Sequence, residues 1–132
     1  RASWRRRAMP RLLRASEDVQ SRLTALQSRL RLPRLPSRIE RVDVSHTAGT
    51  DTVASIVALE DAQPDRKRYR SFHVKRVSGG DDYSAMYEVL ARRFRRGRER
   101  EAGWELPDLL VVDGGRGQLN VALQALRDLG IT

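Results

Sequence analysis

The sequence predicts an α/β domain in which a mixed sheet, three antiparallel strands plus a parallel fourth, is flanked by helices. Three short β-branched runs follow one another between residues 39 and 75, with turn signals between them. A helical stripe over 83–94 then precedes the apolar run "LLVV" at 109–112. A strand that returns through a helix makes a right-handed crossover, so we expect the fourth strand to lie parallel to one of the first three.

The leading segment, residues 1–38, is predicted to be a basic helical connection. Its apolar residues follow one face of a helix, at Leu12, Val19, Leu23, Leu26 and Leu30. The prolines of "LPRLPSR" (32–38) then end the helix, because each disfavours the α conformation in the preceding residue. This segment holds 11 Lys and Arg against 2 Asp and Glu, so it accounts for the whole net charge of +9. We therefore separate residues 1–38 from the domain at 39–132.

The first three strands are predicted as "IERVDVS", "TVASIVALE" and "RYRSFHVK", joined by the turn signals "HTAGTD" and "DAQPD". Val42 and Val44 share one face of the first strand, so Asp43 points to the other face with Ile39 and Arg41. A carboxylate in the middle of a strand is costly unless it is paired or binds a metal. Asp43 is therefore either a metal ligand or the partner of Arg41 or of an arginine at 92–93.

Two helices are expected in the domain. "SGGDD" is a helix-start signal with Asp81 or Asp82 as N-cap. A core-facing stripe follows at Tyr83, Met86, Tyr87, Leu90 and Phe94. The last helix, about 117–128, is predicted to carry Leu119, Ala122, Leu123 and Leu126 on one side.

The strand "LLVV" reads as buried on both faces and ends at Asp113, before the glycine turn "GGRG". If this strand lies beside the first, Asp113 and Asp43 come together. By its position alone, Asp113 is also compatible with an ordinary strand-end turn residue. Four apolar residues before an aspartate resemble a Walker B strand too, but the phosphate-binding pattern G-x-x-x-x-G-K-[ST] is absent from the sequence, which argues against a nucleotide-binding domain.

Composition narrows the remaining classes. The sequence has no cysteine, which excludes disulfides and thiolate metal sites, and no apolar run long enough for a membrane span. An intracellular location is expected, and the lack of a starting Met indicates a fragment. Two basic clusters, "RKRYR" (66–70) with Lys75-Arg76 and "RRFRRGRER" (92–100), are compatible with a solvated face or with phosphate contacts.

Three stretches in order, "VDVSHTAGTDTVASIV", "GGDDYSAMYEVLARRFRR" and "LPDLLVVDGGRGQL", closely resemble the UvrC C-terminal endonuclease family of bacterial nucleotide excision repair. The resemblance runs from about Arg38 to the end of the chain. It implies a fold similar to ribonuclease H and a metal-dependent hydrolysis of DNA, the incision 5′ of a lesion. The implied catalytic and metal-binding residues are Asp43 and Asp113, with Mg²⁺ or Mn²⁺. The implied third catalytic residue, a histidine, is not in this chain, and His46 is not assigned that role.

The resemblance also implies partners: damaged double-stranded DNA and UvrB, with UvrA upstream, in the bacterial cytoplasm and at the nucleoid when active. We expect DNA contacts from Lys75, Arg92, Arg93 and Arg116, where the family often has lysine at the last position. For Arg92 and Arg93, pairing with acids is the open alternative; His46 and His73 are expected to be structural or solvated.

The family has a further strand and helix, so a fragment ending here would leave the edge of "LLVV" bare. We expect that edge to be hidden by a dimer contact or by the leading helix, and expect the fragment alone to cleave poorly. The alternative function is a non-catalytic nucleic-acid-binding module on the same fold, favoured if Asp43 and Asp113 lie too far apart to share a metal.

Overall fold

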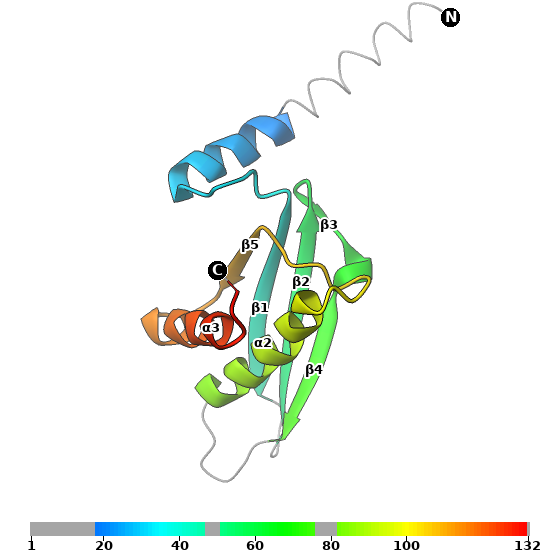
Figure 1. Ribbon diagram of the computed structural model, residues 1–132, viewed down its shortest axis with the longest axis vertical. Coiled ribbons are helices and arrows are strands. Elements are labelled where there is room, and N and C mark those ends of the chain that lie inside the picture. Colours follow the sequence, from blue (N-terminus) through cyan, green and yellow to red (C-terminus); the bar gives the residue numbers. More distant parts are fainter. Residues whose placement is uncertain (1–17, 47–50, 76–81, 132) are drawn as a thin grey trace, which may run out of the picture.

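The structure is a computed structural model that describes residues 18–46, 51–75 and 82–131 (Figure 1). The predicted order of strands and helices is confirmed. The elements are β1 (Arg38–His46), β2 (Asp51–Glu60), β3 (Gln63–Pro64), the 3-10 turn η1 (Arg66–Arg68), β4 (Arg70–Lys75), α2 (Asp82–Arg98), β5 (Leu109–Val112) and α3 (Arg116–Asp128). The sequence predicted neither β3 nor η1, which together fill the connection between β2 and β4. The N-cap predicted at Asp81 or Asp82 involves side chains outside the described part of the chain.

The sheet is mixed, as predicted, with β1 and β2 at its centre. β2 runs antiparallel to β1, from Arg38 opposite Glu60 to His46 opposite Thr52, and β4 runs antiparallel to β2. β5 returns through α2 and pairs with β1 in parallel, from Ile39 opposite Leu109 to Val42 opposite Val112. The strand order β3-β2-β1-β5, with β4 also on β2, therefore places the two predicted aspartates on neighbouring strands.

Helices α2 and α3 lie together on one face of the sheet (Figure 1). The core fills the space between them and that face; its fully buried apolar members include Val42, Ala54, Ile56, Val89, Leu90 and Ala125. The alternation of each strand sends every second residue into this core and leaves the others on an open face. The predicted stripe of α2 is confirmed for Met86, Leu90 and Phe94, whereas Tyr83 is 44% exposed.

The prediction that β5 is buried on both faces was wrong. β5 is not covered on both faces, because both helices lie on the same side of the sheet and Val111 is left 40% exposed on the other. Of the four residues predicted on one side of α3, Ala122 is buried and Leu126 packs against the core, whereas Leu119 and Leu123 are exposed; Ala125 completes the buried face. Alanine side chains are short, so they let α3 pack closely against its neighbours, and the buried face of this helix carries small residues.

The leading helix, residues 18–30, buries Leu23 and exposes Leu30. Figure 1 shows it beyond the end of the sheet where β1 begins, so it does not hide the outer edge of β5 as one prediction had it. Among the described residues no strand pairs with that edge. A dimer contact there stays a prediction. Within the same ranges, none of the helices combines the length and apolar character that crossing a membrane requires.

Candidate active site

Asp43 and Asp113 come next on β1 and β5 after the last paired residues, Val42 and Val112. Val42 is fully buried under the helices, so the residue after it points to the open face, and Asp43 is exposed there. Asp113 is exposed on the same side, because it contacts Arg41, another open-face residue. Neighbouring strands lie about 4.8 Å apart. The predicted strand pairing is thus confirmed, and it brings the two carboxylates to one place.

The turn after Asp113 has a fixed shape that depends on glycine. Gly114 has a φ of 133°, which side chains rarely adopt, and a Cβ there would lie 2.8 Å from the side chain of Gln118. The backbone N–H of Gly115 donates to Gln118 Oε1 at 2.9 Å, and α3 begins at the next residue, Arg116. Of the three glycines in this turn, Gly114, Gly115 and Gly117, only Gly114 has a positive φ. Gly117 serves packing instead, since a Cβ would lie 2.7 Å from the ring of Tyr83.

Asp113 forms an ion pair with Arg41, at 3.3 Å between Nη2 and Oδ2. Both side chains are more than half exposed, at 53% for Arg41 and 63% for Asp113. The sequence had suggested Arg41 as a partner of Asp43, two residues along the same strand. The partner is instead the aspartate on the neighbouring strand, which only the register of β1 and β5 could reveal.

The pair of aspartates fits a Mg²⁺ or Mn²⁺ site by the chemistry of its donors. Mg²⁺ is a hard cation that proteins hold through one or two carboxylates, with water and substrate phosphates completing the shell. Asp43 in β1 and Asp113, the first residue after β5, offer two exposed carboxylates beside each other on the open face. Within the ranges that the structure describes, no cluster of three or more His, Cys, Asp or Glu side chains could hold a metal.

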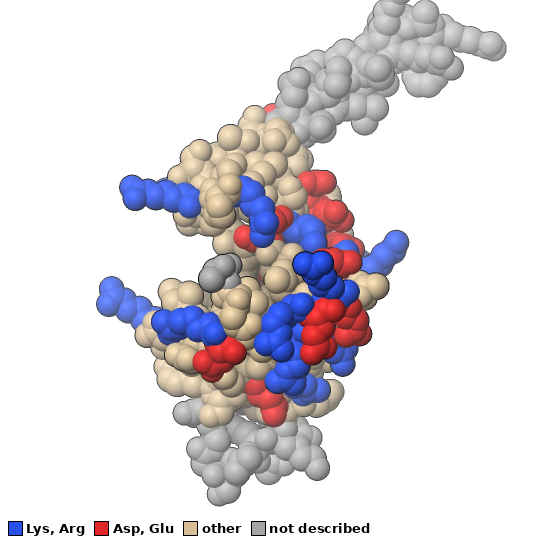
Figure 2. Space-filling view, in the orientation of Figure 1, with Lys and Arg blue, Asp and Glu red and all other residues tan. Residues whose placement is uncertain are grey.

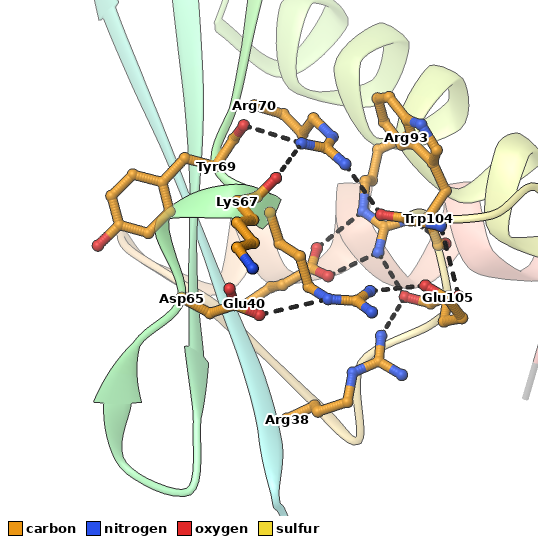
Figure 3. A network of polar contacts seen from close by, with 11 residues as sticks. Arg38, Glu40, Asp65, Lys67, Tyr69, Arg70, Arg93, Trp104 and Glu105 are labelled. Carbon is orange, nitrogen blue, oxygen red and sulfur yellow. Dashed lines mark hydrogen bonds and ion pairs between the residues drawn. The ribbon is translucent and has the colours of Figure 1, made fainter.

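Arg93, expected as a DNA contact or the partner of an acid, is buried and paired (Figure 3). Its guanidinium donates to both carboxylate oxygens of Glu40, at 2.8 and 2.6 Å, and to the backbone carbonyl oxygens of Trp104 and Glu105 at 2.9 and 2.8 Å. Only 3% of the Arg93 side chain and 4% of the Glu40 side chain are exposed. Arg93 therefore presents no surface to DNA and instead pairs with an acid, the alternative that the sequence left open.

Several other arginines of the two basic clusters also converge on Trp104 and Glu105. The guanidinium carbons of Arg70 and Arg96 each lie 4.3 Å from the centre of the Trp104 ring. Arg68 pairs with Glu105 at 2.7 Å. Three hydrogen-bond donors lower the pKa of the Glu105 carboxyl to about 2. In order of decreasing effect they are the backbone N–H of Glu105 itself, the side chain of Arg68 and the backbone N–H of Gly103. Figure 2 accordingly shows basic and acidic side chains interspersed on this face, with no single basic stripe.

The remaining predicted DNA contacts are differently placed. Arg92 is exposed, with its guanidinium 5.2 Å from the ring centre of Phe72 and a hydrogen bond to the carbonyl oxygen of His73 at 3.4 Å. Arg116 is exposed in the first turn of α3, three residues after Asp113. His73 is exposed on β4, as expected of a solvated histidine. The side chains of Lys75 and His46 lie outside the described part of the chain.

Comparison with known proteins gives a consistent result. A family model, the UvrC RNase H endonuclease domain, matches residues 27–132. UvrABC system protein C of Chlorobium chlorochromatii is 49% identical over 110 residues, 83% of this chain and 17% of that protein. The proteins of the same name from Desulfatibacillum aliphaticivorans and Methanosarcina barkeri are 45% and 46% identical, over 89% and 83% of this chain and 19% and 21% of theirs. The chain thus spans about a fifth of the length of these curated relatives.

Proposed function

Because the chain belongs to the UvrC RNase H endonuclease domain family, we propose that it carries the metal-binding carboxylates of a DNA endonuclease that acts in nucleotide excision repair. The observation that carries the proposal is the parallel register of β1 and β5, which sets Asp43 and Asp113 side by side on the open face. Two carboxylates close together on a rigid sheet can seat the divalent metal that a phosphodiester hydrolase of this kind uses.

In this proposal Asp43 and Asp113 hold Mg²⁺ or Mn²⁺, and the bound cation supplies an activated water and neutralises the charge that develops on the phosphate. The strands contribute rigidity: Asp43 lies within β1 opposite Ser55 of β2, and β5 pairs with β1 up to Val42, so Asp43 is held in place without help from a loop. Gly114 and Gly115 themselves place no side chain beside Asp113. Arg116, exposed in the first turn of α3, is proposed to contact a phosphate beside the one that is cut.

The finer assignments belong to the whole protein and are proposed with it. The relatives are named for the UvrABC system, which supports action together with the other Uvr components on DNA. We propose damaged duplex DNA as the substrate, the incision 5′ of the lesion as the reaction, and UvrB as the direct partner, in the bacterial cytoplasm. Arg92, Arg116 and Lys75 are the proposed DNA contacts.

Binding of Mn²⁺ to the purified chain, followed by electron paramagnetic resonance of the free ion, tests the metal site. Asp43→Asn and Asp113→Asn should each weaken binding at least tenfold, because each removes one charged ligand. Asp61→Asn is the matched control: it makes the same change of charge at an exposed turn, at the end of the sheet where β1 begins. If the two site variants bind Mn²⁺ as the parent chain does, the carboxylates are not a metal site, and the non-catalytic DNA-binding alternative is favoured.

A further inference from the structure

Arg41 occupies a position on the open face for which the fold itself gives no reason. Its neighbours across the sheet are Val57 on β2 and Val111 on β5, both exposed and apolar. The aliphatic stem of Arg41 can cover these valines, but they offer its guanidinium no polar partner. The partner that the structure gives it is Asp113, one step further along β5. The positive charge of Arg41 therefore lies next to one of the two carboxylates proposed to bind the cation.

The ion pair between Arg41 and Asp113 is easily broken. It consists of one contact at 3.3 Å between side chains that are both mainly in solvent. Exposed ion pairs of this kind contribute little to stability, because water and salt screen the charges and holding two long side chains costs entropy. A divalent cation at Asp113 carries twice the charge of a guanidinium and repels it at close range. Arg41 and the cation are thus competitors for the same carboxylate.

Once released, Arg41 has another anion within reach. Two residues along a strand span about 6.7 Å, so the Cα atoms of Arg41 and Asp43 are separated by roughly the length of an arginine side chain. A phosphate lying over Asp43 and Asp113 would be accessible to the guanidinium, whose planar fork binds phosphate oxygens in pairs.

We propose that Arg41 is a phosphate-binding residue whose availability depends on the metal. Without a divalent cation Arg41 pairs with Asp113, and cation binding releases it to contact the DNA strand. The inference rests on the proposed function, since it needs a cation at Asp113. Its consequence is that cation and DNA bind cooperatively, because loading the carboxylates with metal exposes one more positive charge to the phosphates.

The test compares Arg41→Met, Arg41→Lys and the parent chain, all checked for folding by circular dichroism. First, Arg41→Met should bind Mn²⁺ roughly five- to tenfold more tightly, because a like charge near the cation has been removed.

Second, binding of a short fluorescent duplex is measured over a range of NaCl concentrations, in EDTA and in saturating Mn²⁺, with the duplex checked for cleavage. In Mn²⁺, Arg41→Met should reduce the slope of log K against log salt by about one, and in EDTA it should leave the slope unchanged.

Two carboxylate variants complete the experiment. In EDTA, Asp113→Asn should raise DNA affinity more than Asp43→Asn, because both remove one negative charge but only the first frees Arg41. The double variant R41M/D113N should lose that excess, and Arg41→Lys should keep the salt slope in Mn²⁺. An Arg41→Met effect on the salt slope that is equal in EDTA and Mn²⁺ would overturn the proposal, as would unchanged Mn²⁺ affinity. Failure of the metal site itself is recognised separately, by normal Mn²⁺ binding to Asp43→Asn and Asp113→Asn.

Discussion

The buried pair of Arg93 and Glu40 makes a quantitative prediction about stability. Arg93→Met keeps most of the side-chain volume but removes the guanidinium. It leaves the Glu40 carboxylate buried without its partner, and the carbonyl oxygen of Trp104 without this donor. Removing one member of a buried ion pair costs about 3–5 kcal/mol. Domains of this size are stable by about 5–15 kcal/mol, so the substitution should remove a large part of the total.

Urea unfolding followed by circular dichroism measures this cost, and the neighbouring arginine provides the control. Arg92 is exposed and contacts the ring of Phe72, so Arg92→Met should change the free energy of unfolding by no more than about 1 kcal/mol. The double variant R93M/E40M replaces both buried charges by apolar groups and should recover more than half of the loss, since apolar replacement of a whole buried pair is often neutral. A loss under about 1 kcal/mol for Arg93→Met would refute the reasoning. A double variant no more stable than the single one would assign the cost to packing instead of charge.

Three further predictions concern other parts of the chain. The pKa of Glu105 is lowered to about 2 in the folded protein, so its contribution to stability is present above its ordinary value of 4.5 and is lost as pH falls toward 2; melting temperatures of the parent and Glu105→Gln should differ above pH 5 and converge near pH 2, and a constant difference would contradict this. Gly117→Ala should destabilise the chain by about 1–3 kcal/mol through the clash with Tyr83, despite the better helix propensity of alanine; Tyr83→Ala in the same background should relieve the clash, and a neutral Gly117→Ala would mean that the ring moves aside freely. Removing residues 1–17 deletes six of the eleven arginines of the leading segment and should flatten the salt dependence of DNA binding if these six bind DNA; an unchanged slope would exclude them and leave binding to the rest of the chain.

The sequence predicted the sheet and the position of the aspartates because both follow from local patterns. Alternation along β1 placed Asp43 on the face of the sheet away from Val42, and the crossover rule placed β5 parallel to an earlier strand. The sequence analysis left open whether Arg92 and Arg93 contact DNA or pair with acids, although a local signal was available for Arg93. Arg93 lies three residues after Leu90 and seven after Met86, on the buried stripe of α2, and Glu40 shares the core-facing side of β1 with Val42. Two opposite charges at core positions predict a buried pair.

Other features were beyond the sequence because they depend on how distant elements meet. The contact between Arg41 and Asp113 joins residues 72 positions apart and requires the register of β1 and β5. The exposure of Val111, Leu119 and Leu123 depends on both helices packing on one face, and an apolar side chain carries no local sign of which face is covered. The stacking of Arg70 and Arg96 on Trp104 likewise depends on β4 and α2 bringing their side chains to the loop before β5.

The buried pair and the exposed aspartates are connected through the two strands that carry them. Glu40 and Asp43 lie on opposite faces of β1, three residues apart, so the arginine that fixes Glu40 also fixes the strand that presents Asp43. The same guanidinium binds the carbonyl oxygens of Trp104 and Glu105, in the loop that leads into β5 and Asp113 (Figure 3). One buried residue of α2 therefore contacts both β1, which carries Asp43, and the loop that leads through β5 to Asp113. A metal site tolerates errors of only about 0.5 Å in ligand position, so we infer that Arg93 serves the proposed chemistry by holding the sheet in register, without contact with the cation or DNA.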